Sequence, residues 1–257
     1  MRIGWIGLMA FVWAGVIHAE IVTQTIKYPI AGKSYVGYLA YDDSIKEPRP
    51  GIVVFHEWWG LNDFARSKAE ALAELGYVAF AADMYGKGMA THDPEQAGQW
   101  YTEVSENRAF RKRAQAAVNV LKKQAGVDPK RIGAIGFCFG GTTVLELAYS
   151  GADVQGVVSF HGGLTAPGEA DRDQIQSAIL VLHGAQDPFV KPEQLEAFES
   201  GLKASSADWQ LVIYGNTLHS FTNPKADSVD MEGLAYNPLS DRRSWAAMQQ
   251  FFDEVLR

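Results

Sequence analysis

The sequence contains a single cysteine, Cys138, and that scarcity excludes several classes of protein. One thiol can form no internal disulfide, so neither a disulfide framework nor a cysteine-rich zinc module can be built from this chain. The histidines are scattered as well, since His56, His92 and His161 have no partner at the spacing of metal ligands. We therefore expect no metal site and no cofactor.

Positive charge is also in short supply, because 23 Lys and Arg stand against 30 Asp and Glu and leave a net charge of −7. Phosphate groups are bound by a positive field, so nucleic acid and anionic membrane surfaces are poor partners for this chain. With 47% hydrophobic and 21% charged residues, the composition is that of an ordinary globular domain. We expect a small molecule as its partner.

No apolar run is long enough for a membrane span, and the longest begins near the N-terminus. Arg2 precedes Ile3–Ile17, which contain only apolar residues and Gly and fall short of the roughly 20 residues that a spanning helix needs. A positive start, an apolar run and a small residue such as Ala19 are typical of a secretory signal. We expect cleavage after Ala19, a periplasmic or secreted domain of residues 20–257, and no stable membrane association afterwards. An uncleaved N-terminal anchor is the alternative.

The rest of the chain alternates between strand and helix patterns. Ile21–Ile30 and Lys33–Tyr41 flank Ala31-Gly32 and predict an antiparallel hairpin. Six apolar runs without strict alternation follow, as expected for strands buried on both faces of a mainly parallel sheet: Gly51–His56, Gly76–Ala82, Arg131–Phe137, Val154–His161, Ala178–His183 and Gln210–Tyr214. Helical patterns fill the gaps: Leu61–Leu75, Arg108–Gln124, Gly141–Tyr149, Pro192–Leu202 and Asp241–Leu256. This order predicts one doubly wound α/β domain with helices on both faces of the sheet.

The single cysteine follows one of the predicted strands. It lies at the centre of Gly136-Phe137-Cys138-Phe139-Gly140-Gly141, which matches the nucleophile-elbow pattern Gly-x-nucleophile-x-Gly with Cys in place of the usual Ser. Such a turn places the thiol at a helix N-terminus, where the dipole and free N–H groups favour a thiolate. The pattern predicts a nucleophile, and the alternative is a buried structural Cys beside glycines that pack a helix.

A base and an orienting acid follow in the chain. Asp187 comes just after the strand Ala178–His183, and His219 lies in the loop after the last apolar strand. The order nucleophile, acid, histidine is that of α/β-hydrolases. In this interpretation His219 takes the proton of Cys138, Asp187 holds its tautomer, and a thioester intermediate forms. The N–H of Phe139 would help to bind the oxyanion.

Glu57 lies in the loop after the first buried strand, where the second oxyanion donor is normally found. A carboxylate there would repel the developing negative charge unless it points away or controls the thiol. Glu57 could hold Cys138 un-ionised until substrate displaces it. The alternative is that Glu57 caps the helix that begins near Leu61.

Five segments together resemble the dienelactone hydrolase family, whose members are α/β-hydrolases with a cysteine nucleophile. The resemblance runs from about Ile26 to the C-terminus. It implies a triad of Cys138, Asp187 and His219, an oxyanion hole from the N–H groups of Trp58 and Phe139, and a Glu57 that pairs with the resting thiol. The segments are His56-Glu57-Trp58-Trp59-Gly60-Leu61-Asn62, Ala82-Asp83-Met84-Tyr85, Gly136–Gly141, His183-Gly184 with Asp187, and His219-Ser220-Phe221.

The sequence departs from the family at two positions that concern the substrate. Members that open dienelactone hold its carboxylate with two arginines, and here Lys87 and Asn223 stand in those places. Lys offers only a point charge and Asn offers none. Trp58, Trp59, Tyr85 and Phe139 would instead give an aromatic pocket for a less charged ester, or else pack in the core.

We therefore predict a cofactor-free hydrolase of a small carboxylic ester or lactone. A thioesterase or acyltransferase is the alternative among enzymes, because another nucleophile can intercept a thioester. A non-catalytic binding protein on the same scaffold is the alternative outside enzymes.

Overall fold

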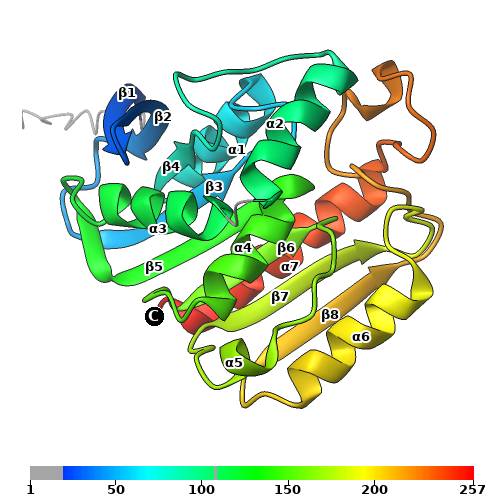
Figure 1. Ribbon diagram of the computed structural model, residues 1–257. Coiled ribbons are helices and arrows are strands. Elements are labelled where there is room, and N and C mark those ends of the chain that lie inside the picture. The colour runs from blue at the N-terminus through cyan, green and yellow to red at the C-terminus, as the bar shows by residue number, and fades with distance from the viewer. Residues whose placement is uncertain (1–19, 107–108) are drawn as a thin grey trace, which may run out of the picture.

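The computed structural model describes residues 20–106 and 109–257 and is built around one sheet (Figure 1). The sheet order is β1-β2-β4-β3-β5-β6-β7-β8, with antiparallel pairing of β1 with β2 and of β2 with β4, and parallel pairing elsewhere. The strands are β1 (Ile21–Ile30), β2 (Lys33–Asp42), β3 (Arg49–Phe55), β4 (Val78–Ala82), β5 (Val127–Phe137), β6 (Gly156–Phe160), β7 (Ala178–Gly184) and β8 (Trp209–Tyr214). The predicted sheet and N-terminal hairpin are confirmed. The predicted signal segment, residues 1–19, lies outside the described residues.

Helices cover both faces of this sheet, as predicted (Figure 1). Along β3, Ile52 and Val54 pack toward α1 and α7, whereas Val53 and Phe55 pack toward α3, α4 and α6. Strict alternation of side chains along a strand divides the core in this way. The helices are α1 (Asp63–Glu74), α2 (Pro94–Glu106), α3 (Ala109–Leu121), α4 (Phe139–Tyr149), α5 (Glu169–Arg172), α6 (Pro192–Lys203) and α7 (Pro238–Val255), with a 3₁₀ turn η1 (Ala226–Ser228). In the part of the chain that the structure describes, none is long and apolar enough to cross a membrane.

Two of these helices are absent from the sequence prediction. Helix α2 buries only Ala97 and Val104, so its apolar stripe is too thin to reveal a period of 3.6. Its start could have been recognised, because Asp93 precedes Pro94 and its Oδ1 accepts from the N–H of Glu95 at 3.0 Å. Helix α5 is a four-residue turn, too short for any periodicity.

The carboxyl ends of the parallel strands bring the residues of interest to one edge of the sheet. His56 follows β3, Cys138 follows β5, His161 follows β6, and Asp187 and His219 lie in the loops after β7 and β8. Open parallel sheets hold their ligands outside this edge. The fold therefore gathers side chains from segments far apart in the sequence.

Candidate active site

Cys138 occupies a strained turn between β5 and α4. Its φ of 54° and ψ of −113° lie outside the regions that L-residues usually adopt. The turn requires glycine on both sides, because a Cβ on Gly136 would lie 1.9 Å from the carbonyl O of Gly140, and a Cβ on Gly140 would lie 2.1 Å from the carbonyl O of Phe55. The glycines of the sequence pattern are thus explained by close backbone packing.

His219 lies between the cysteine and a carboxylate. Its Nδ1 is 2.7 Å from Oδ2 of Asp187, and its ring lines the same cavity as the Cys138 sulfur. The other oxygen of Asp187 accepts from the N–H of Phe189 at 2.9 Å, which fixes the carboxylate. Burial by itself lowers the pKa of His219, but the neighbouring Cys138 and Asp187 more than offset this effect and raise the pKa to about 10. The site therefore favours an imidazolium beside the sulfur.

Glu57 is buried beneath this pair and bonds to the loop that carries His219. Its Oε1 accepts from the Ser220 hydroxyl at 3.0 Å, and its Oε2 accepts from the Asn223 amide at 2.7 Å. Burial raises the pKa of Glu57, while the two hydrogen bonds act in the opposite direction. In this conformation both oxygens of the carboxylate bond to the histidine loop.

The alternative that Glu57 caps a helix is wrong. Helix α1 begins at Asp63, and the Oδ1 of Asn62 accepts from the N–H of Ala65 at 3.2 Å, so Asn62 is the cap. Both carboxylate oxygens of Glu57 are directed to Ser220 and Asn223 instead.

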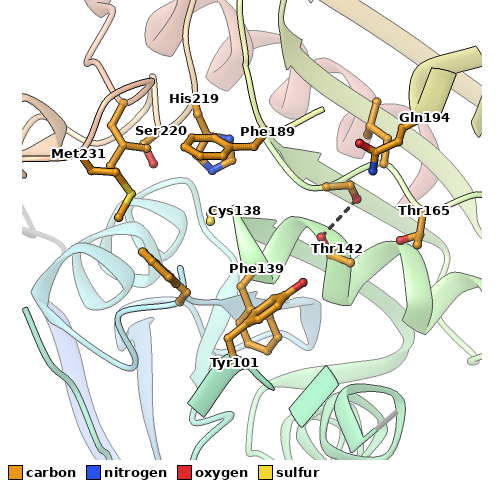
Figure 2. Close-up of a pocket in the computed structure, with 14 residues that line it drawn as sticks. Tyr101, Cys138, Phe139, Thr142, Thr165, Phe189, Gln194, His219, Ser220 and Met231 are labelled. Atoms are coloured by element: carbon orange, nitrogen blue, oxygen red, sulfur yellow. Dashed lines mark hydrogen bonds between the residues drawn. The ribbon is translucent and has the colours of Figure 1, made fainter. Parts of the chain in front are cut away.

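A cavity of about 360 Å³ opens above Cys138, with His219 on one side of the sulfur and Phe139 on the other (Figure 2). Trp58 and Phe139 contribute to its wall, as predicted for pocket residues. The remaining lining residues are Tyr101, Thr142, Gly163, Leu164, Thr165, Phe189, Gln194, Ser220, Met231 and Leu234. Most of this lining lies outside the motifs that the sequence pointed to.

Four residues predicted to contact substrate lie outside this wall. Trp59 is buried against Trp58, with ring centroids 4.8 Å apart. The Tyr85 ring stacks on Phe139, and its hydroxyl donates to the carbonyl of Trp58 at 2.9 Å, so Tyr85 supports the wall from behind. Lys87 is exposed at a turn, and Asn223 turns its amide to Glu57.

The segment between β8 and α7 shapes the cavity and is attached to His219. The N–H of His219 donates to the carbonyl of Gly233, and the N–H of Ala235 donates to the carbonyl of His219, both at 3.1 Å. This attachment brings Met231 and Leu234 into the wall. The sequence offers no periodic signal here, because the segment is irregular apart from η1.

His161 is a further residue of the site that we did not assign to it from the sequence. It is completely buried, with a φ of 41°, and directly follows β6. Its Nδ1 accepts from the backbone N–H of Cys138 at 3.1 Å, a donor that is shared with the carbonyl of Phe160 at 3.0 Å. Its Nε2 is 2.8 Å from the Thr222 hydroxyl. Burial lowers its pKa well below the usual range, so the ring is neutral.

His56 and Asp83 fix the loops beside the cavity. His56 is buried with a pKa lowered to about 4 by burial, and its Nε2 accepts from the N–H of Met84 at 3.2 Å. The Asp83 carboxylate accepts from four backbone N–H groups: Val36, Tyr85, Gly86 and Gly88. Both residues are used structurally, and the described residues contain no cluster of three or more potential metal ligands.

Known proteins similar to this chain agree with its fold and motifs. The model of the dienelactone hydrolase family matches residues 36–256. The chain is 30% identical to Protein usf of Aquifex pyrophilus and 29% identical to a putative carboxymethylenebutenolidase of Aquifex aeolicus, in each case over 91% of this chain and 99% of the relative.

Two solved structures are similar over nearly their whole length. One, named m3DLH, is 45% identical with a TM-score of 0.89 and covers 92% of this chain and 99% of its own. The other, a dienelactone hydrolase-like promiscuous phosphotriesterase from metagenomic libraries, is 41% identical with a TM-score of 0.90 and covers 93% and 100%. The resemblance inferred from the motifs is confirmed, and the chain belongs to the dienelactone hydrolase family.

Proposed function

We propose that this protein is an exported hydrolase that cleaves a small carboxylic ester or lactone, with Cys138 as the nucleophile. The observation that carries the proposal is the His219 ring, which pairs with Asp187 at 2.7 Å and lines the same cavity as the Cys138 sulfur. A base held by an acid and aimed at a nucleophile is the arrangement that covalent acyl transfer needs. Membership of a hydrolase family supports the same reaction.

The reaction follows from the position of the proton. His219, whose raised pKa favours the imidazolium, takes the proton of the Cys138 thiol, and the resulting thiolate attacks the acyl carbon. The tetrahedral intermediate expels the alcohol as His219 gives it the proton, which leaves a thioester on Cys138 and a neutral imidazole. His219 then takes a proton from water, the hydroxide attacks the thioester, and the acid leaves as the thiolate is restored.

The oxyanion of each tetrahedral intermediate needs donors close to the sulfur. Phe139 is the first residue of α4, so its N–H is one of those that a helix leaves without an intrahelical acceptor. The positive end of the helix dipole adds to the effect. We assign the second donor to the N–H of Trp58, whose residue lines the same cavity.

Other substrates and acceptors fit the same nucleophile. A phosphotriester is the second candidate substrate class, because a relative 41% identical to this chain is described as a promiscuous phosphotriesterase. Attack of the thiolate on phosphorus would expel the phenol or alcohol and leave a phosphorylated Cys138. Acyl transfer to an alcohol or amine in place of water is the remaining enzymatic alternative.

Ester turnover tests the proposal directly. Hydrolysis of p-nitrophenyl acetate at pH 7.5 should fall by about 10³-fold in Cys138→Ala, as expected when a nucleophile is removed. His92→Ala, at an exposed position outside the cavity wall, is the matched control and should hydrolyse at the wild-type rate. Mass spectrometry of rapidly quenched enzyme should find the acyl group on Cys138. Equal rates for wild type and Cys138→Ala would leave a binding protein as the better description.

A further inference from the structure

The cavity wall contains few charged side chains. Among the described residues that line it there is no Lys, Arg, Asp or Glu, and apart from Tyr101 its ionisable groups are Cys138 and His219. The wall is instead made of aromatic and aliphatic side chains together with the neutral polar groups of Thr142 and Gln194. A substrate anion entering this space would lose water and meet no cation except the imidazolium of His219, which is already paired with Asp187.

Three buried or half-buried basic residues of α1 and α3 are committed to other partners. Arg111 of α3 forms ion pairs with two carboxylates, at 2.6 and 2.7 Å. Arg113 donates to the carbonyl of Met84 at 2.6 Å, and Lys68 pairs with Asp241 at 3.6 Å. Reaching the cavity would require each of them to break these contacts.

We propose that this cavity selects uncharged acyl groups and discriminates against substrates that carry a carboxylate on the acyl chain. The inference rests on the proposed function, because it concerns the same nucleophile. A buried carboxylate is tolerated only when it is paired or fully hydrogen-bonded, and the one cation of this wall, His219, is already paired with Asp187. The thiolate would repel a second negative charge in addition.

Two esters that differ only in charge test this selection. In p-nitrophenyl pentanoate the acyl chain ends in a methyl group, whereas in p-nitrophenyl hemiglutarate a carboxylate takes its place. We expect kcat/KM to be higher for the pentanoate by on the order of 100-fold, after correction for the uncatalysed rates. If the enzyme hydrolyses neither ester, the proposed function is contradicted. If kcat/KM is equal for the two esters, only the proposed selection against charge is overturned.

A charge introduced into the wall provides the second arm. Gln194 lies on the rim of the cavity, and its Oε1 accepts from the N–H of Lys191 at 3.0 Å (Figure 2). Gln194→Arg should raise the ratio of hemiglutarate to pentanoate turnover by about 10-fold, whereas the neutral Gln194→Met should not. An unchanged ratio in Gln194→Arg would show that charge does not set the preference and would overturn the proposal.

A second, independent inference concerns the role of His161 in the same reaction. Because the ring is neutral and its Nδ1 accepts from Cys138, its proton lies on Nε2 and is donated to Thr222. One imidazole thus joins the backbone of the nucleophile to a residue three positions after His219. The rings of His161 and His219 also meet edge to face, with centroids 5.1 Å apart.

We infer that His161 is a positioning residue that holds the nucleophile elbow and the histidine loop in register. It touches no substrate, since it is fully buried and lies outside the cavity wall. Its two hydrogen bonds fix where the sulfur and the imidazole of His219 stand relative to each other. A small error in that distance lowers the rate of proton transfer without changing substrate binding.

Two substitutions break the hydrogen bond between His161 and Thr222, one from each side. Thr222→Val removes the hydroxyl at nearly constant volume, and His161→Asn keeps an acceptor close to Nδ1 in a residue that tolerates positive φ. Each should lower kcat by about 10-fold with little change in KM, and the double variant should be no worse than either single variant. Thermal unfolding of Thr222→Val should stay close to wild type. Unchanged kcat, or losses that multiply in the double variant, would overturn the inference.

Discussion

His219 shows how strongly single residues of this site depend on one another. Its pKa of about 10 arises because Cys138 and Asp187 outweigh the effect of burial. The raised value means that the folded chain binds this proton more tightly than the unfolded chain does. The contribution of His219 to stability is therefore complete below about pH 6.5, its unfolded pKa, and is lost as the pH rises toward 10.

We predict that Cys138→Ser lowers the pKa of His219, because the influence of Cys138 that raises this pKa is removed while burial, which lowers it, remains. NMR titration of the imidazole in wild type and variant measures this change. The same titration of Asp187→Asn should also show a fall. A pKa near 10 that persists in Cys138→Ser would mean that the sulfur does not hold the proton on His219.

Glu57 allows two interpretations that differ in outcome. If it gates the thiol, as the family resemblance implies, Glu57→Gln should increase alkylation of Cys138 by iodoacetamide in the absence of substrate. The structure favours a second role, because the carboxylate accepts from both Ser220 and Asn223 and a Gln amide can accept from only one of them.

We therefore expect Glu57→Gln to lower kcat by about 10-fold and to slow alkylation as well, since the charge-assisted hydrogen bonds that hold the histidine loop become weaker neutral ones. Ser220→Ala, which removes one donor and leaves the carboxylate, is the control with a smaller expected effect. Faster alkylation together with wild-type kcat would favour the gate.

Single residues also mark the limit of what the sequence predicts. Cys138, Asp187 and His219 could be found because each follows a strand whose apolar pattern is clear. The sequence pattern could not show whether Asn223 contacts substrate, because the direction of its side chain depends on a hydrogen bond to Glu57, which is far away in the chain. The bridge made by His161 depends likewise on neighbours from other strands.

At the scale of elements, the nucleophile elbow depends on the closest backbone contacts in the fold. We predict that Gly136→Ala destabilises the protein by about 3 kcal/mol or more, because its Cβ would lie 1.9 Å from a backbone oxygen of α4. Urea unfolding measures the loss. Gly98→Ala is the matched control: Gly98 lies within α2 with open space around it, so alanine should be neutral or stabilise the protein by up to about 1 kcal/mol. Equal stability of the two variants would contradict the account of the elbow.

The elements that the sequence missed are those whose burial is partial. The strands β3, β4, β6 and β7 were predicted almost in full because they are buried on both faces. Helix α2 shows only two buried residues, and yet it supplies Tyr101 to the cavity. The segment after β8 has little regular structure and supplies Met231 and Leu234. The scaffold was therefore more predictable than the substrate pocket it carries.

At the scale of the whole molecule, the described residues form a single sheet covered by helices. Its first strand begins at Ile21, directly after Glu20, the predicted first residue of the cleaved chain. Export remains a prediction from the apolar run Ile3–Ile17. N-terminal sequencing of the exported protein should find Glu20 as its first residue. An intact Met1 in the exported protein would contradict the prediction.

The two sides of the cavity differ in how they are attached to the catalytic groups. Gly233 and Ala235 bond to the backbone of His219, and the N–H of Phe189 bonds to Asp187. The side of the wall that contains Phe189, Met231 and Leu234 is therefore attached directly to the base and its acid. Tyr101 and Gln194 belong to helices that carry neither group. Natural or laboratory evolution could therefore change the substrate range at those two helices while keeping the turnover rate. Changes in the opposite wall would alter both together.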